Sequence, residues 1–338
     1  MKKNILILSL ILAGAIGFIL VLMGHSGPGT LMIHQPRRYS GVEAIAVDSI
    51  RLPSSLNTME IEGCFLYGYA AQQKVLYRYA IENRQTDTLL YIPTLFSGVL
   101  NGIALDPATT TFYFLNARSE KIYLYHPQNA GKDSLPTQTI PPAGGEICLT
   151  SQQFFIRAVN YSTSVATLKK VDYSRHLDTT LYTFAHYSDG GISSDGFFRK
   201  DRSSKKQFFI PYYNGEIIVY DEGADKISKI ITIDRTAPYN AAISIENGYA
   251  LSGKAKMINI AAATDSTHLY LLSNTSSPGK DEPAGTVIDI YSTLTGMYEN
   301  SLQLPYFEGY PVTLLEKSGD RLYIAFKNNI ISYKINYR

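Results

Sequence analysis

The sequence predicts an all-β fold built from a repeating unit, and three observations lead to this prediction. Short runs of β-branched and aromatic residues alternate with turns rich in Pro, Asp, Asn and Ser, which is the pattern of strands and hairpins. The chain has 26 Tyr and no Trp, a composition that suits half-buried sheet surfaces. The same strand pattern also returns at a spacing close to that of a four-stranded blade. Together these features predict a six-bladed β-propeller, and a separate apolar run near the start of the chain predicts an N-terminal transmembrane or signal helix before it.

The clearest unit spans residues 101–131, NGIALDPATTTFYFLNARSEKIYLYHPQNAG. It holds three strand-like runs, at 103–105, 111–115 and 121–125, and a turn separates each run from the next. We interpret this unit as one blade, and the rest of the chain follows the same pattern.

The second strand of each blade gives the strongest repeat. Its first residues are separated by 47, 42, 54, 61 and 53 residues, which scatter around the period of four-stranded blades. These runs are Phe65-Leu66-Tyr67, Phe112-Tyr113-Phe114, Phe154-Phe155-Ile156, Phe208-Phe209-Ile210, Leu269-Tyr270-Leu271 and Leu322-Tyr323-Ile324. A third strand follows each at a steady distance, at 75–79, 122–125, 166–171, 217–220, 287–291 and 330–333.

Outermost strands are predicted where a run ends in an apolar residue, usually before Pro. Pro suits this place because an edge strand can end without donating another ladder hydrogen bond. The segments of this form are 90–93, 137–141, 231–234 and 302–305.

The last blade has no outermost strand of its own before the chain ends at Arg338. Near the start of the chain, Ser49–Pro53 has the right form for that strand. We therefore predict that a strand at 44–53 completes the last blade, which closes the ring and removes an open sheet edge.

The long spacing between the fourth and fifth blades coincides with residues 238–256. Asn247-Gly248 within this region is a strong signal for a two-residue hairpin turn. The region is either an inserted hairpin or a reduced seventh blade. We favour the insertion, because no third and fourth strands follow at the blade period.

Residues 1–24 form a membrane-targeting segment. Ile5–Met23 is a run of 19 residues without charge, enough to cross a hydrocarbon core, and Lys2 and Lys3 precede it. By the positive-inside rule, the propeller at 43–338 is then exported and tethered to the outer side of the membrane. The alternative is a cleaved signal peptide and a secreted or periplasmic protein, because Gly24-His25-Ser26 resembles a cleavage site. Residues 25–42 are predicted to be a linker.

Net charge and cysteine content bear on two questions, the expected partners and the presence of a disulfide. The formal net charge is +2 and no long basic run occurs, so nucleic acid is not an expected partner. Cys64 and Cys148, the two cysteines, fall in strands of different blades on this assignment, so we expect two buried, reduced thiols rather than a disulfide.

Candidate site residues follow from propeller geometry, because the innermost strands line the central channel and ligands sit where those strands begin. The residues predicted at this channel mouth are Asn101, Glu146, Asp195 and Asn259. Carboxylate and amide oxygens from several blades are the ligands that calcium or another divalent cation requires. The competing interpretation is that these residues only form turns, as Asp and Asn before Gly commonly do.

Two stretches resemble a known superfamily. The blade at 101–125 and the stretch 193–221, with its Asp195-Gly196 pair, resemble blades of the gluconolactonase and regucalcin family, of the yellow and major royal jelly proteins, and of NHL-type propellers. In the lactonases the matching Asn and Asp bind the metal, which implies Asn101 and Asp195 here. The third ligand there is a Glu of a Glu-Gly-Pro motif. Glu62-Gly63 is its nearest match, but Cys64 replaces the Pro, and Glu62 is expected to border a second strand.

The sequence therefore favours a non-catalytic module that binds a protein or a small ligand, without a cofactor. The alternative from another class is a metal-dependent hydrolase of the lactonase type, and a structural module of an envelope complex is a third reading. The chain contains none of the HExxH, GxSxG or CxxC motifs that would favour an enzyme directly.

Overall fold

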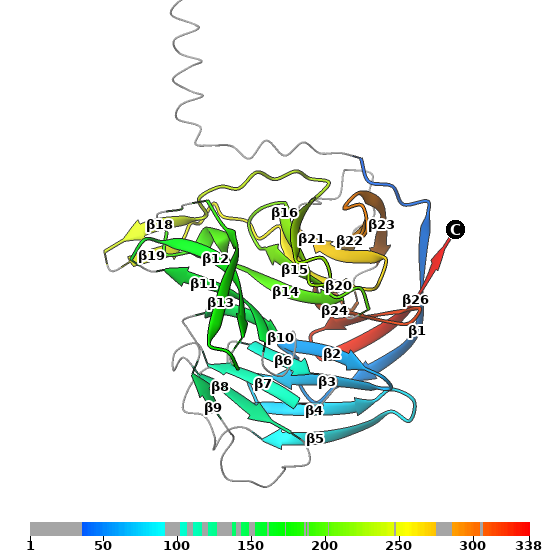
Figure 1. The fold of residues 1–338 in the computed structure, drawn as a ribbon. Helices are drawn as coiled ribbons and strands as arrows, with labels where there is room; N and C mark the ends of the chain where they lie inside the picture. The colour runs from blue at the N-terminus through cyan, green and yellow to red at the C-terminus, as the bar shows by residue number, and fades with distance from the viewer. Residues whose placement is uncertain are drawn as a thin grey trace, which may run out of the picture.

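The structure, a computed structural model, is a ring of six four-stranded antiparallel sheets. Figure 1 shows the six blades around the ring axis, with the first strand of each blade at the centre. The residues it describes are 36–91, 102–106, 111–116, 121–126, 137–139, 143–148, 153–160, 162–172, 174–185, 187, 189–201, 203–246, 248–274, 286–304 and 307–338.

The strands follow one another blade by blade. The first blade holds β2 (Thr58–Glu62), β3 (Phe65–Ala70), β4 (Val75–Ala80) and β5 (Gln85–Tyr91). The second holds β6 (Gly102–Asp106), β7 (Thr111–Asn116), β8 (Lys121–Tyr125) and β9 (Thr137–Thr139). The third holds β10 (Ala143–Cys148), β11 (Gln153–Asn160), β12 (Val165–Asp172) and β13 (Leu177–Thr183). The fourth and fifth hold β14 (Gly196–Asp201), β15 (Lys206–Pro211), β16 (Glu216–Asp221) and β17 (Lys226–Ile231); and β20 (Asn259–Thr264), β21 (His268–Ser273), β22 (Thr286–Ser292) and β23 (Tyr298–Leu304).

The sixth blade joins the two ends of the propeller. It contains β24 (Val312–Ser318), β25 (Arg321–Phe326), β26 (Asn329–Tyr337) and, as its outermost strand, β1 (Val42–Arg51). β1 runs antiparallel to β26, from Val42 opposite Tyr337 to Arg51 opposite Asn329. The predicted ring closure by an N-terminal strand is confirmed, although the strand begins two residues earlier than expected and ends before Pro53.

Residues 238–256 form an insertion and not a seventh blade. They contain a two-stranded sheet, β18 (Ala242–Ile245) and β19 (Gly248–Leu251), between the last strand of the fourth blade and the first of the fifth. Figure 1 shows this hairpin at the left edge of the ring, beyond the inner strands.

The core lies between the blades. Alternate side chains of a strand point to opposite faces of its sheet. In β15, Phe208 and Ile210 therefore pack towards the fifth blade, while Phe209 packs towards the third. Both faces are buried, which explains why the second strand of each blade is a continuous apolar run. These runs were the strongest sequence repeat, and all six are second strands in the structure.

The outermost strands differ most from the prediction. β17 ends at Ile231, where the predicted strand 231–234 was to begin, and β13 had no predicted counterpart. Every residue of β13 is exposed or half-buried, because one face of an outermost strand meets water. Such strands lack the apolar pattern from which the inner strands were predicted.

Two further predictions concern the cysteines and the membrane segment. Cys64 is exposed in the turn between β2 and β3 and carries a free thiol, so the prediction of a buried strand residue was wrong for it. No helix among the described residues is long and apolar enough to cross a lipid bilayer. Residues 1–35, which include the predicted anchor, lie outside the described residues.

Candidate functional site

The innermost strands of neighbouring blades begin at the same end of the ring, which we call the mouth. Tyr212 follows β15, and its amide donates to the Asp195 carbonyl at 2.9 Å, just before β14. The Tyr212 carbonyl accepts from the amide of Ile258 at 2.7 Å, just before β20. These bonds bring the starts of β14 and β20 together.

A tight turn before β14 forms one side of the mouth. Asp189 is fully buried, and its carboxylate accepts from the amides of Gly191 at 2.9 Å and Ser193 at 2.7 Å. Gly190 and Gly191 adopt positive φ angles of 64° and 91°, which favour glycine. The turn continues as a short 3-10 helix, η2 (Ile192–Ser194), and places Asp195 at the start of the innermost strand.

Gly196 explains the Asp-Gly pair that drew attention in the sequence. A Cβ atom at Gly196 would lie 2.3 Å from the backbone oxygen of Ile210 on the neighbouring strand. The close approach of two strands therefore requires glycine there. The pair has a structural reason that is independent of any ligand.

Asp195 faces a buried arginine. Arg157 on β11 donates from Nε to the Ser194 carbonyl at 2.8 Å, and it also donates to the Gly191 carbonyl. Its Nη1 lies 3.5 Å from Asp195 Oδ1. The Arg157 side chain is 5% exposed and that of Asp195 is 44% exposed. Burial among its neighbours raises the pKa of Asp195, and the Arg157 guanidinium opposes this rise.

Aromatic rings surround this ion pair. Tyr212 is half-buried, with its ring 5.5 Å from that of Phe197 and 6.1 Å from that of Tyr213. Burial raises the pKa of Tyr212, and the Asp195 charge raises it further. We call Arg157, Asp195, Tyr212 and Tyr213 the mouth cluster. It combines a half-exposed carboxylate with phenol groups that remain protonated at neutral pH, so it can accept and donate hydrogen bonds to a ligand.

The other predicted mouth residues have different surroundings. Asn259 begins β20 and is buried, and its Nδ2 donates to the carbonyls of Pro211 at 2.6 Å and Asn214 at 2.9 Å. Both bonds join the fifth blade to the fourth, so this amide group has a structural role. Glu146 is the fourth residue of β10 rather than its start. Asn101 lies outside the described residues, and its role stays a prediction.

Glu62 lies away from the mouth. It is the last residue of β2, an innermost strand, and it pairs with Phe65 at the start of β3, so it borders a second strand as predicted but belongs to a first strand. It therefore lies at the opposite end of the ring from the strand starts, and the structure does not bring it to Asp195. Within the described part of the chain, no three His, Cys, Asp or Glu side chains gather where they could hold a metal ion.

A second charged group, on the outer strands of the fifth blade, was not predicted from the sequence. Arg37, whose side chain is 3% exposed, donates from Nε and Nη2 to both carboxylate oxygens of Asp289, each at 2.9 Å. Its Nη2 also donates to Asp234 at 2.9 Å. Ser301 donates to Asp289 at 2.6 Å and Ser273 to Asp234 at 3.2 Å. We call these five residues the Arg37 cluster.

The Arg37 cluster fixes the chain just after residues 1–35. Ser273 pairs with Asn259 at the start of β20, whereas Asp289 and Ser301 are the middle residues of β22 and β23. Arg37 therefore binds between the middle and the mouth end of the fifth blade. The chain then continues along that blade, where the amide of Ser301 donates to the Arg38 carbonyl at 2.7 Å. Residues 37 and 38 of the predicted linker are therefore held against the propeller.

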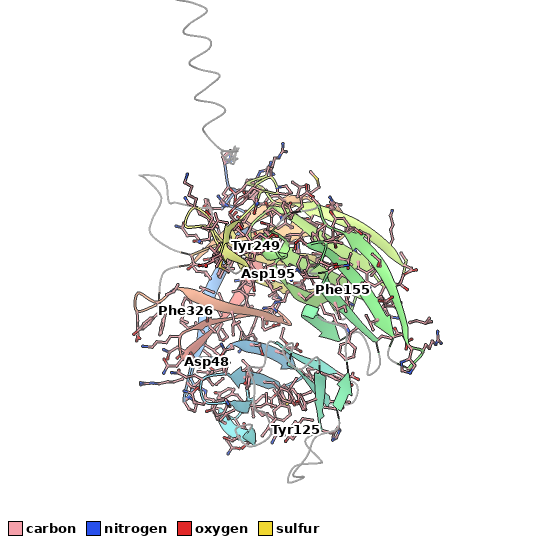
Figure 2. All side chains as sticks on the ribbon, turned by 90° about the vertical axis from the view of Figure 1, so that its left-hand side faces the viewer. Asp48, Tyr125, Phe155, Asp195, Tyr249 and Phe326 are labelled. Carbon is pink, nitrogen blue, oxygen red and sulfur yellow. The ribbon has the colours of Figure 1, made fainter. Side chains whose placement is uncertain are left out.

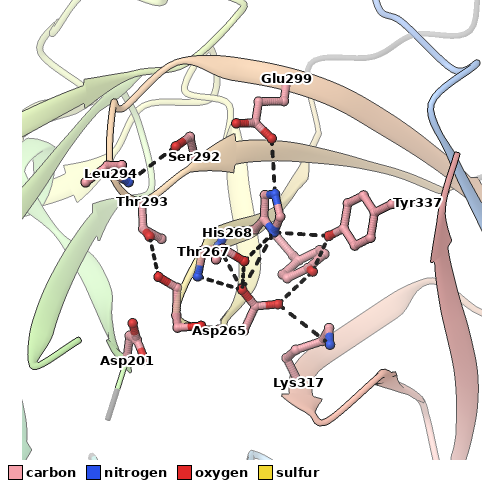
Figure 3. A network of polar contacts seen from close by, with 12 residues as sticks. Asp201, Asp265, Thr267, His268, Ser292, Thr293, Leu294, Glu299, Lys317 and Tyr337 are labelled. Carbon is pink, nitrogen blue, oxygen red and sulfur yellow. Dashed lines mark hydrogen bonds and ion pairs between the residues drawn. The ribbon is translucent and has the colours of Figure 1, made fainter. Parts of the chain in front are cut away.

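A third charged group lies at the end of the ring opposite the mouth, in the turn after β20 (Figure 3). Asp265 accepts from Tyr270 at 2.8 Å, and its carboxylate lies 3.6 Å from Lys317 Nζ on β24. His268 lies 3.7 Å from Asp265 and 3.1 Å from Glu299. Its ring stacks on Tyr337 at 4.9 Å. We call these six residues the Asp265 cluster, and it connects the fifth blade to the sixth.

The pKa values in this cluster shift in opposite directions. Burial alone raises the pKa of Asp265, but hydrogen bonds from His268, Thr267 and Tyr270 bring it below its usual range. The Asp265 carboxylate holds the pKa of His268 above its usual 6.5. Burial lowers the pKa of Lys317 and raises that of Tyr337 to about 12.

Sequence comparisons identify no relative: no protein-family model matches the chain, and no curated protein matches it. Solved structures do match. A member of the DUF4221 family from Bacteroides vulgatus aligns with a TM-score of 0.57 at 13% identity, over 89% of this chain and 100% of that one. A protein of unknown function from Bacteroides thetaiotaomicron aligns with a TM-score of 0.50 at 8% identity, over 88% and 73%. At such identities the likeness concerns the fold alone, and the fold is that of a six-bladed β-propeller.

Proposed function

We propose that this chain is an exported β-propeller, tethered to a membrane by residues 5–23, that binds a ligand or a protein through the mouth cluster. The observation that carries the binding role is the pairing of Asp195 with Arg157. The carboxylate is 44% exposed, while its cationic partner is buried and held by backbone carbonyls. A charged group presented to solvent by a rigid, buried partner is suited to recognition, because little of it must reorganise when a ligand arrives.

The same pairing disfavours metal chemistry at Asp195. The Asp195 carboxylate lies 3.5 Å from a guanidinium nitrogen, so a divalent cation bound to it would be close to a second positive charge and the two would repel. A lactonase also needs several oxygen ligands from different blades around the cation. Glu62, which the resemblance implies as a ligand, lies at the other end of its strand.

Site-specific photo-crosslinking in native membranes tests the binding role. A photoreactive residue replaces Tyr212 in the full chain, and a matched control carries it in place of Leu294, an exposed residue in a turn at the opposite end of the ring. We expect a discrete adduct at 212 and none at 294, with the adduct reduced by Asp195→Asn. Adducts that are the same at both positions would contradict the proposal.

Two further assays test the membrane tether and the alternative hydrolase activity. Carbonate-washed membranes should retain the intact protein, whereas a soluble species beginning near Gly27 would show a cleaved signal peptide. Metal-stimulated hydrolysis of simple lactones that is lost in Asp195→Ala, with unchanged unfolding, would favour the hydrolase instead.

A further inference from the structure

The inserted hairpin β18–β19 presents apolar side chains to solvent. Ile243 is 51% exposed, Ile245 49%, Leu251 47% and Tyr249 41%. Met257, which follows the hairpin, is 39% exposed. Exposed apolar residues that gather in one place indicate an interaction surface, whereas single ones do not.

The hairpin is fixed at its base beside the mouth cluster. The amide of Ala241 donates to Ser193 Oγ at 2.6 Å, and the amide of Ser252 donates to the Ala241 carbonyl at 2.8 Å. The Tyr249 ring lies over Gly190, where a Cβ atom would approach it to 3.2 Å. Figure 2 shows Tyr249 and Asp195 on the same side of the ring.

The two faces of the hairpin differ. Ser244 pairs with Tyr249 and Ala242 with Leu251, so these four side chains share one face, and Tyr249 turns that face towards the propeller. Ile243 pairs with Ala250 and Ile245 with Gly248, so both isoleucines share the other face. The isoleucine face is therefore the one turned away from the ring, while Tyr249 and Leu251 on the other face are also partly exposed, at 41% and 47%.

The charges near the hairpin favour an anionic surface. Lys254 and Lys256 are exposed just after β19. Exposed apolar side chains next to lysines are typical of segments that lie in a membrane interface. Glu246 is exposed at the hairpin turn, and a carboxylate there opposes entry of the turn into hydrocarbon. The hairpin is thus suited to lie flat along the interface.

The chain reaches the propeller at the fifth blade. Arg37 binds Asp289 in the middle of β22, and thirteen residues separate it from Met23, the last residue of the apolar run. Such a segment spans at most about 45 Å even when fully extended. An anchor at residues 5–23 would therefore keep the propeller near the bilayer.

We propose that the isoleucine face of the β18–β19 hairpin rests on an anionic lipid surface, so that the mouth cluster faces the membrane. The orientation rests on the proposed tether, whereas the lipid contact of the hairpin does not. A ligand or protein that binds the mouth would then approach it along the membrane.

Tryptophan fluorescence tests this contact without background, because the chain contains no Trp. The full chain, carrying Ile243→Trp, is reconstituted into phosphatidylglycerol-containing vesicles with and without brominated lipid. Leu251→Trp reports the other face of the hairpin. Leu177→Trp is the control, because Leu177 is 58% exposed at the end of the ring opposite the mouth.

We expect brominated lipid to quench Ile243→Trp strongly, Leu251→Trp less and Leu177→Trp not at all. Replacing Lys254 and Lys256 by Gln should weaken the hairpin's contact equilibrium roughly fivefold per lysine on anionic vesicles, and not on neutral ones. Equal quenching of Ile243→Trp and Leu177→Trp would overturn the proposal. So would an emission of Ile243→Trp that shifts with protein concentration but not with lipid, because the hairpin would then cover a second copy.

The tether and the hairpin contact can fail separately. Vesicle flotation of the full chain reports the tether, and quenching reports the hairpin. A protein that floats while Ile243→Trp stays unquenched contradicts the hairpin contact and leaves the tether standing. Quenching on vesicles that do not retain the protein through a carbonate wash supports the hairpin contact and contradicts the tether.

Discussion

The Arg37 cluster lies between the middle and the mouth end of the fifth blade, the Asp265 cluster lies at its other end, and both join distant parts of the chain. The Arg37 cluster connects residue 37 to residues 234 and 289 through a guanidinium that stays charged at any relevant pH. The Asp265 cluster connects the fifth blade to the sixth through His268, which stacks on Tyr337 and can gain or lose a proton, with a pKa held above its usual value. The first is thus a permanent connection and the second a titratable one.

The two clusters also differ in how deeply their charged side chains are buried. The side chains of Arg37, Asp234 and Asp289 are at most 3% exposed, so each charge depends on its partners for stabilisation. In the Asp265 cluster Lys317 is 5% exposed, but Glu299 and Asp265 are 46% and 27% exposed, and water can stabilise these two charges when a partner is lost. Losing one residue should therefore cost more at the Arg37 cluster than at the Asp265 cluster.

The largest loss of unfolding free energy is expected for Arg37→Ala. This change leaves two buried carboxylates without their cation, which typically costs about 3–5 kcal/mol of unfolding free energy. Urea unfolding of the full chain in detergent measures it. Arg38→Ala is the control: Arg38 bonds to Ser301 and Tyr298 through its backbone, so we expect a change within about 0.5 kcal/mol. Equal stability of the two variants would contradict the role of Arg37.

The second-largest loss of unfolding free energy is expected for Asp265→Asn. It removes the charge that faces Lys317 and weakens the bonds from Thr267 and His268. A hydrogen bond to a charged group contributes roughly 1.5–3 kcal/mol, so we expect a loss of about that size. Asp320→Asn is the matched control, because its pair with Lys334 is more than half exposed and should contribute about 1 kcal/mol or less.

The contributions of the two clusters to the unfolding free energy should depend differently on pH. The pKa of His268 is raised in the folded state, so its contribution is complete below its usual value of 6.5 and is lost as the pH rises through the folded value. The pKa of Asp265 is lowered, so its contribution is present above 3.8 and is lost as the pH falls through the folded value.

The measurement compares the wild type with His268→Asn between pH 5.5 and 9. We expect the stability difference to shrink as the pH rises. The difference between the wild type and Arg37→Ala should not shrink over that range, because the guanidinium keeps its proton. A difference for His268→Asn that is constant with pH would show that His268 contributes through packing alone.

The inner strands could be predicted from the sequence for a physical reason. Strands such as β15 and β21 are buried on both faces, so the four residues that follow one another at the centre or end of each are all apolar and the repeat is strong. The outermost strands carry a weak signal because water meets one face. The strand that closes the ring was found because the last blade lacked its fourth strand.

The polar clusters were harder to predict because their residues come from distant positions. A signal was nevertheless present: Arg157 and Asp289 are single charges inside otherwise apolar strands, and a buried charge needs a partner. The sequence does not say which partner, since Arg37 and Asp289 are 252 residues apart. Asp195 was found from its Asp-Gly pair, although Gly196 is explained by strand packing and not by a ligand.

The turns between strands also carry a recognisable sequence motif. Asp or Asn, followed two residues later by Ser or Thr, occurs where strands end. The first side chain accepts from the amide and hydroxyl of the second residue, as in Asn160 with Ser162 and Asp201 with Ser203. Such bonds fix a turn locally. Asp265 with Thr267 belongs to this group, so a turn motif also supplies the central carboxylate of the titratable cluster.

The smallest loss of unfolding free energy is expected for Tyr337→Phe, and changes at this residue test most directly how His268 connects the two blades. Tyr337 is about half exposed, so losing its hydroxyl bonds to Tyr270 and His268 should cost about 0.5–1.5 kcal/mol. The stacked ring remains in the variant, and a protonated imidazole is attracted to it. A double-mutant cycle of Tyr337→Ala with His268→Asn isolates the pairwise energy. It should be larger at pH 5.5, where His268 carries its proton, than at pH 9. An interaction energy that does not change between these pH values would mean that the charge of His268 does not act through Tyr337, and the titratable connection would then depend on Asp265 and Glu299 alone.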